Sequence, residues 1–215
     1  MDIRASTGKI ESIKDYALQL SMVVMGILIA LGVDGLRETW REHALVERSI
    51  ESMRSELESN KALAQKVIAG YDELRKTVES VIALTEEILK QKAAKAPPAP
   101  DDRTIELGFA IPSFNTGAWQ AAVATQALAH MEYSQASVWS TMYARQSQVQ
   151  LVQNEWIGVL GRLSLLEASN EDSIEQLQQR LAFAKEVLQR INLTQMAWRN
   201  LLVQYAATLD TTAQK

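Results

Sequence analysis

The chain has 215 residues, of which 47% are hydrophobic, so it is long enough to bury the core of one domain. It contains no cysteine, which excludes disulfides, thiolate metal sites and cysteine nucleophiles and leaves the redox compartment open. Its formal net charge of −4 gives no basic surface for nucleic acid, so we expect no nucleic-acid partner.

The first predicted element is a transmembrane helix over residues 16–36, preceded by a short tail over residues 1–15. Residues 17–33 carry no charge. A helix over 16–36 is about 32 Å long, which matches a hydrocarbon core of roughly 30 Å. Tyr16 and Trp40 lie about 36 Å apart along such a helix, which places one aromatic anchor in each membrane interface.

Three further residues complete the predicted membrane anchor. Gly26 and Ala30 form a small-xxx-small pair that lets another helix approach closely. Asp34 stands near the end of the span, where a short carboxylate reaches headgroups and water. Two other interpretations remain open: a signal peptide cleaved near residues 30–32, and a buried core helix of a soluble protein.

The flanking charges do not decide the orientation of the span. Three positive residues precede it and three follow it: Arg4, Lys9, Lys14, Arg37, Arg41 and Arg48. Because a short tail before an early span usually stays in the cytoplasm, we expect a single-pass protein of the bacterial inner membrane. Its soluble part then lies in the periplasm.

Residues 37–91 are predicted to continue the span as a long stalk or bundle helix. Apolar or small residues recur there every three or four positions: Val46, Ile50, Met53, Leu57, Asn60, Ala64, Val67, Tyr71, Leu74, Val78, Val81, Thr85 and Ile88. Asn60 is the polar member of this coiled-coil-like seam, and a buried amide there can fix register or oligomeric state. A tolerated polar residue is the alternative.

Residues 92–115 form a predicted proline-containing loop and connector, because three prolines stand between 97 and 100. The helical bundle remainder then covers residues 116–210. It comprises an alanine-rich helix over 116–131, a longer helix from Tyr133 onward and a last helix from Ile174, before a frayed tail over 211–215. Seams of apolar residues mark the two longer helices: Val138, Met142, Val149, Val152, Trp156, Val159, Leu163 and Leu166, then Ile174, Leu177, Leu181, Ala184, Leu188, Ile191, Gln195, Trp198, Leu202 and Tyr205.

The predicted fold class is therefore all-α, an antiparallel three- or four-helix bundle joined to the transmembrane helix by a stalk. After the proline loop we expect the 116–168 segment to return along the first helix and the last helix to run outward again. A soluble helix over 35–91 is about 85 Å long, and the later ones are shorter. Its membrane-proximal turns should remain uncovered.

No catalytic or cofactor pattern is present. The two histidines, His43 and His130, are far apart in sequence, and no HxxxH or ExxH spacing accompanies them, so we expect no metal and no cofactor. Six of the thirteen aromatic residues fall within 35 positions: Phe109, Phe114, Trp119, Tyr133, Trp139 and Tyr143. With His130 nearby, they either wall a small-molecule pocket, dock a partner or pack where a short helix crosses the bundle.

The stretch that begins VVMGILIALGVDGLRETWREHALVERS at Val23 resembles the opening of a broad group of uncharacterised bacterial single-span membrane proteins. The segment AWQAAVATQALAHM, which starts at Ala118, resembles their mid-chain region. The resemblance implies that membrane anchoring and a helical soluble domain occur together, and it implies no activity.

These features favour a membrane-anchored helical interaction or scaffold module, such as an accessory subunit of a bacterial envelope complex. Its partners are then the lipid bilayer and either further copies of itself or another membrane protein. The alternative is a ligand-sensing helical bundle that signals through a partner subunit. An enzyme is not expected, because it would need a site assembled from carboxylates and histidine across helices.

Overall fold

The computed structural model describes residues 13–97, 112–160, 162, 166 and 169–213, and the side chains of 13–15, 157, 160 and 213 are not described. The predicted 1–15 tail, Phe109, Leu163 and most of the 92–115 connector therefore lie outside the described residues. Within them every regular element is a helix. The chain divides into two compact units, Met1–Arg48 and Ser49–Lys215, and each is described by itself.

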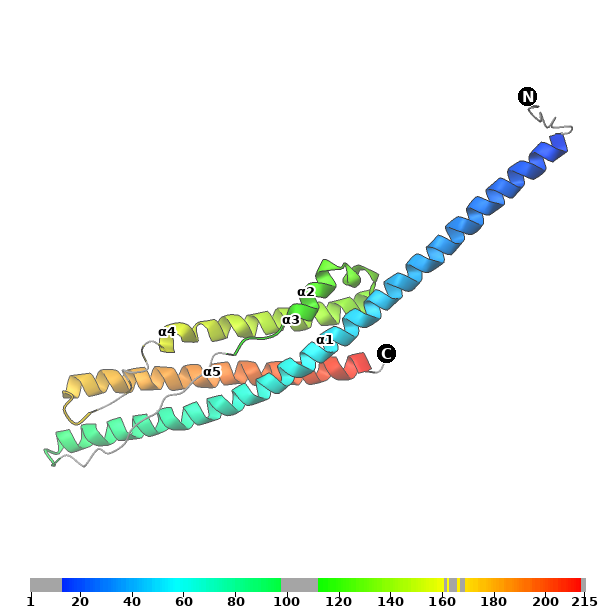
Figure 1. The fold of residues 1–215 in the computed structure, drawn as a ribbon. Helices are drawn as coiled ribbons and strands as arrows, with labels where there is room; N and C mark the ends of the chain where they lie inside the picture. Colours follow the sequence, from blue (N-terminus) through cyan, green and yellow to red (C-terminus); the bar gives the residue numbers. More distant parts are fainter. Residues whose placement is uncertain (1–12, 98–111, 161, 163–165, 167–168, 214–215) are drawn as a thin grey trace, which may run out of the picture. The chain divides into compact units, whose positions relative to one another are not determined.

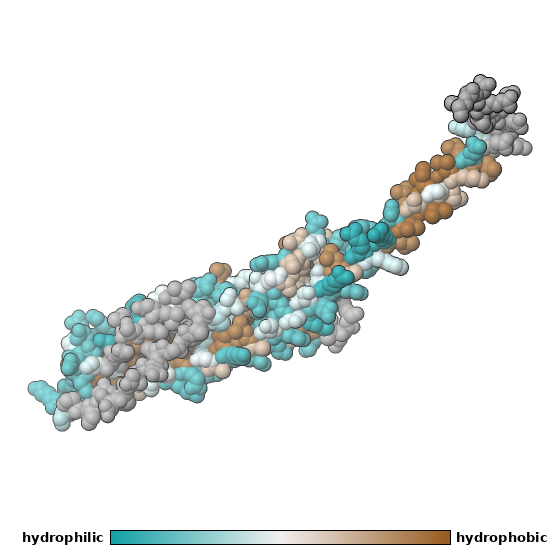
Figure 2. All heavy atoms as spheres, in the orientation of Figure 1, coloured by the Kyte–Doolittle hydropathy of each residue, from teal (hydrophilic) through white to brown (hydrophobic). Residues whose placement is uncertain are grey.

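The first unit contains the beginning of helix α1 (Ile13–Ala93). Near its N-terminus α1 is long and apolar enough to cross a membrane, and none of that stretch is buried inside the protein. Figure 2 shows it as a brown sleeve of apolar side chains around the helix. A core helix of a soluble protein would be buried, and within the described residues this stretch is not.

The second unit contains the rest of α1 and all later helices. These are α2 (Gly117–Ala124), the 3₁₀ helix η1 (Ala127–His130), α3 (Tyr133–Asn154), α4 (Trp156–Leu160) and α5 (Ile174–Ala213). Ser173 starts α5 with a reciprocal cap, because its hydroxyl accepts from the Gln176 N–H while the Gln176 side chain accepts from the Ser173 N–H. The long helix α1 packs against α5 (Figure 1).

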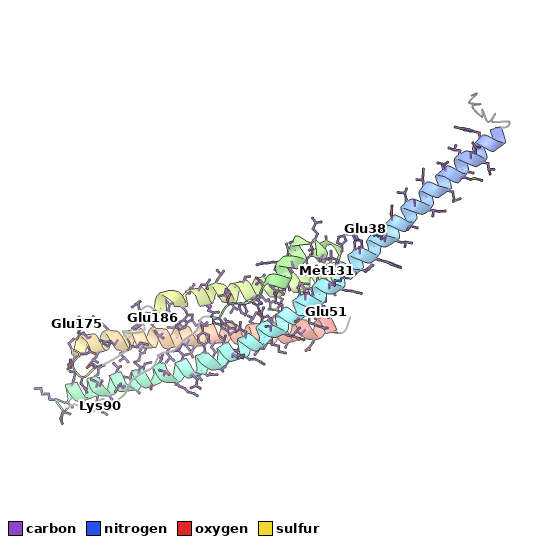
Figure 3. The ribbon with its side chains drawn as sticks, viewed as in Figure 1. Glu38, Glu51, Lys90, Met131, Glu175 and Glu186 are labelled. Atoms are coloured by element: carbon purple, nitrogen blue, oxygen red, sulfur yellow. The ribbon has the colours of Figure 1, made fainter. Side chains whose placement is uncertain are left out.

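Helices α1 and α5 run antiparallel. Arg54 contacts Leu209, Asp72 contacts Gln195 and Glu86 contacts Lys185, so the position in α5 falls as the position in α1 rises. Figure 3 agrees, since Lys90 near the end of α1 and Glu175 at the start of α5 lie at the same end of this unit.

Helix α3, by contrast, runs parallel to α1, and the expectation of a returning helix after the proline loop was wrong. Glu56 contacts Tyr143, Asn60 contacts Gln146 and Tyr71 contacts Trp156, so both positions rise together. Asn115, just before α2, therefore lies at the level of Asn60 rather than at the level of Ala93, where α1 ends.

The α1 seam is the core of this unit. From Met53 to Ile88 every predicted seam residue is buried, Asn60 and Thr85 among them. The predicted seam of α5 is also largely buried, with Leu177, Ile191, Trp198 and Tyr205 inside. Period-3.6 patterning located these faces correctly because each helix buries a single stripe.

Three finer expectations were wrong. The alanine-rich helix is not continuous over 116–131, since Gln126 adopts a left-handed conformation (φ 60°) between α2 and η1. The helix that follows stops at Asn154 and resumes as the short α4. Most of the predicted seam is buried, including Met142, Val149, Trp156 and Val159, but Val152 is exposed, and Gln146 and Gln153 are buried as well. At the start of α5, Ile174 also belongs to the predicted seam but is exposed.

Candidate functional site

The predicted membrane anchor lies on the exposed part of α1. Tyr16, Gly26, Ala30, Asp34 and Trp40 are all exposed. A Cβ placed on Gly26 would meet no atom within 4 Å, so the small pair presents open helix surface. In the first unit no described residue buries these side chains.

A layer of polar side chains crosses the interior of the second unit. The Asn60 amide nitrogen donates to the Asn115 carbonyl (2.8 Å) and to Gln146 Oε1 (3.1 Å), and Asn60 Oδ1 accepts from the Asn115 N–H (3.0 Å). The Tyr205 hydroxyl donates to the same Gln146 oxygen (2.7 Å). This layer joins α1, α3 and α5 through hydrogen bonds that are strong because water is excluded.

The segment before α2, residues 112–116, is held against the bundle as a strap. Gln153 donates to the Pro112 carbonyl (3.1 Å), and Asn115 is bound by Asn60 as above. Between them Phe114 is buried against Trp198, with ring centroids 4.9 Å apart. Two buried amides and one aromatic ring therefore fix this non-helical segment, whose backbone has no helical hydrogen bonds of its own.

Glu56 ties α2 and α3 to α1. Its carboxylate accepts from the Tyr143 hydroxyl (2.7 Å) and from the Ala118 N–H (2.8 Å) in the first turn of α2. A carboxylate at a helix N-terminus is stabilised by the helix dipole. Burial, together with the neighbouring Glu56 carboxylate, raises the pKa values of Tyr143 and Tyr205 well above the usual range, so both phenols stay protonated.

The predicted aromatic cluster is only partly assembled. Trp119 stacks on Tyr143 with centroids 4.8 Å apart, and Trp139 is fully buried. His130 is exposed, and Tyr133 is 86% exposed at the start of α3. These five residues therefore do not line one interior space. The three buried or half-buried rings, those of Trp119, Trp139 and Tyr143, pack between α1, α2 and α3.

A charged group lies on the surface where α1 meets α5. Asp72 accepts from Gln195 (2.8 Å) and lies 3.0 Å from Arg75 and 3.6 Å from Arg199. The Gln195 hydrogen bond, followed by the arginine charges, lowers the pKa of the Asp72 carboxyl, while partial desolvation opposes this. Such a half-exposed ion pair orients helices rather than performing chemistry.

In the described part of the chain no three His, Asp or Glu side chains converge to hold a metal ion. The carboxylates of Glu56 and Asp72 each accept hydrogen bonds that hold helices together.

A groove runs along the outer seam of α3 and α5, and sequence reasoning missed it. Three adjoining hollows of about 280, 370 and 300 Å³ share lining residues, Arg145 and Gln204 between the first two and Val152 between the last two. Together they extend from Ser137 beside Thr211 to Val159 beside Glu186. The sequence did carry a signal for this groove, a second stripe along α3 formed by Val138, Arg145 and Val152. Val138 and Val152 were instead predicted to lie in the core seam.

Comparison with known proteins adds no identity. No protein-family model matches this sequence, and no curated protein or solved structure is detectably similar to it. The function must therefore be argued from the geometry.

Proposed function

We propose that this chain is a membrane-anchored helical interaction module, an accessory or scaffold subunit of a bacterial envelope complex. The observation that carries the proposal is the exposed apolar sleeve at the beginning of α1. Its leucine, isoleucine, valine and methionine side chains are all about half exposed or more. A sleeve of this size in water would be strongly unfavourable, whereas a bilayer removes it from water.

The second unit supports binding rather than catalysis. Its interior polar groups, at Asn60, Gln146 and Glu56, are used to hold helices and the strap in place. Its surface carries the α3–α5 groove, where two helices leave a face that a further helix fits. An antiparallel bundle with an open seam is a common architecture for helix docking.

In this proposal the protein is single-pass in the inner membrane, with the helical unit in the periplasm. The anchor residues Tyr16 and Trp40 sit at the two interfaces, and Gly26 with Ala30 offers close helix contact within the bilayer. The partner is another copy or another membrane protein. A cleaved signal peptide is the competing account of the same apolar stretch.

The experiment is topology mapping combined with crosslinking in intact membranes. A reporter enzyme that works only after export is fused after Lys215, and a cytoplasm-active reporter is fused at the same place in parallel. We expect only the exported reporter to be active, the chain to resist alkaline extraction, and the purified protein to retain its original N-terminus. A mature N-terminus near residue 33, or release by alkali, would show that the stretch is not an anchor.

A further inference from the structure

The α3–α5 groove has the length and lining of a helix-docking surface. It follows α3 and α4 from about position 138 to 159, which corresponds to about 32 Å of helix. Two helices about 10 Å wide make a face of roughly 640 Å², close to the ~800 Å² per partner of a stable complex. Val152, Ala197 and Leu201 give its middle an apolar floor.

The charges in the groove are placed in a definite order. At one end Glu155, between α3 and α4, and Arg190 of α5 line the same hollow. Arg190 pairs with Glu186 on its own helix (3.1 Å), but within the described chain Glu155 has no ion-pair partner. Arg145, further along α3, likewise has none, and it stands beside the neutral Gln204. Figure 3 shows Glu186 on α5 at the end of the bundle near α4.

We propose that the occupant of this groove is the same α3–α5 face of a second copy of the chain, related by a two-fold axis parallel to the helices. In that arrangement α3 of each copy lies on α5 of the other, and the four helices form an antiparallel bundle. Glu155 of each copy then faces Arg190 of the second copy, twice per dimer. Arg145 faces the neutral Gln204 of the second copy, and Glu186, which lines the same hollow as Glu155, is paired with Arg190 on its own helix.

This inference rests on the proposed function, because the membrane supplies the second copy. Two chains anchored in one bilayer are confined to a thin layer, which raises their effective concentration and makes a modest interface sufficient. The interface is isologous, so one face with balanced charge serves both partners.

The test uses the full chain in native membranes, where the absence of cysteine gives a clean background. One tagged chain carries Glu155→Cys and a second, differently tagged chain carries Arg190→Cys. Mild oxidation should give a covalent heterodimer carrying both tags. When both chains carry Arg190→Cys, the yield of covalent dimer should be at least tenfold lower, because the two cysteines lie on opposite sides of the two-fold axis.

A matched pair of surface variants tests the face itself. Leu193 lines the groove and is 58% exposed, whereas Met196, 59% exposed on the same helix, does not line it. Each variant is introduced into both cysteine-bearing chains. Leu193→Glu should lower the yield of the crosslinked heterodimer at least tenfold, and Met196→Glu should leave it unchanged. The charge reversal Glu155→Arg should separate the copies in a size measurement, and adding Arg190→Glu should restore the dimer.

The proposal is overturned if the heterodimer does not form in chains shown to be membrane-anchored, or if the two glutamate variants act alike. It is also overturned if Glu155→Cys crosslinks only to a different protein. Crosslinking to a different protein would contradict the dimer but not the proposed interaction-module function. Release of the chain from the membrane would contradict the proposed function as well. The helical circular dichroism of each variant shows whether it has folded.

Discussion

Asn60 in α1 donates a 3.1 Å hydrogen bond to the side-chain oxygen of Gln146 in α3, across 86 residues of sequence. Both side chains are buried, and both also hold the backbone of Asn115. One amide pair thus sets the register of two helices and the position of the strap between them. Because each buried polar atom needs a partner, sliding either helix by a turn would break several hydrogen bonds at once.

Asn60→Ala should therefore destabilise the protein by about 2–3 kcal/mol, since it removes the three hydrogen bonds that Asn60 makes with Asn115 and Gln146. The measurement is chemical unfolding of the full chain in detergent, followed by circular dichroism. The control is Asn192→Ala, which removes an exposed amide on α5 and should change the free energy of unfolding by less than about 0.5 kcal/mol. Equal losses in the two variants would contradict this role for Asn60.

Glu56→Ala should free the beginning of α2, because the Ala118 N–H and the Tyr143 hydroxyl both lose their acceptor. We expect a loss of about 1–3 kcal/mol and faster amide hydrogen exchange over Gly117–Ala124. Glu58→Ala, an exposed neighbour on the same helix, should affect neither quantity. Unchanged exchange in α2 would show that Glu56 does not hold this helix.

Stability should fall as the pH rises above about 10. Burial raises the pKa values of Tyr71, Tyr143 and Tyr205 in the folded protein, whereas in the unfolded chain they ionise near 10. Below pH 10 both states keep the protons. Above it only the unfolded state releases them, so each tyrosine lowers the free energy of unfolding by about 1.4 kcal/mol per pH unit until its folded-state pKa is reached.

Alkaline unfolding curves measure this slope, with phenolate absorbance reporting ionisation. Tyr205→Phe should reduce the slope by the contribution of one tyrosine. Tyr133→Phe should not, since Tyr133 is exposed in the folded protein. A slope insensitive to Tyr205→Phe would mean that this phenol ionises without unfolding.

Leu28→Arg should weaken membrane retention, because an arginine near the centre of a span costs about 2.5–3.5 kcal/mol. Alkaline extraction of membranes measures the retained fraction. Val203→Arg is the control, since Val203 has comparable exposure on α5 but belongs to the second unit, and it should leave retention unchanged. Equal retention of Leu28→Arg and the unchanged chain would argue against a spanning role.

The sequence by itself determined the helical class, the apolar stretch and the buried face of α1. These depend on local composition and on a 3.6-residue period, which a single helix expresses whatever it packs against. It also placed the end of α1 within two residues of Ala93, because prolines cannot continue a helix. The start of α3 at Tyr133 was located in the same way.

Only the tertiary structure decided the direction of α3, the strap and the groove. The level of the bundle at which α2 begins is set by contacts such as Asn60 with Asn115, which have no local signature. Gln146 and Gln153 look like surface residues in sequence, yet they are buried because a non-helical backbone needs their hydrogen bonds. Val152, which the seam pattern placed in the core, is instead exposed and lines the α3–α5 groove, because a helix position at the edge of a buried stripe is assigned to one side only by its tertiary neighbours.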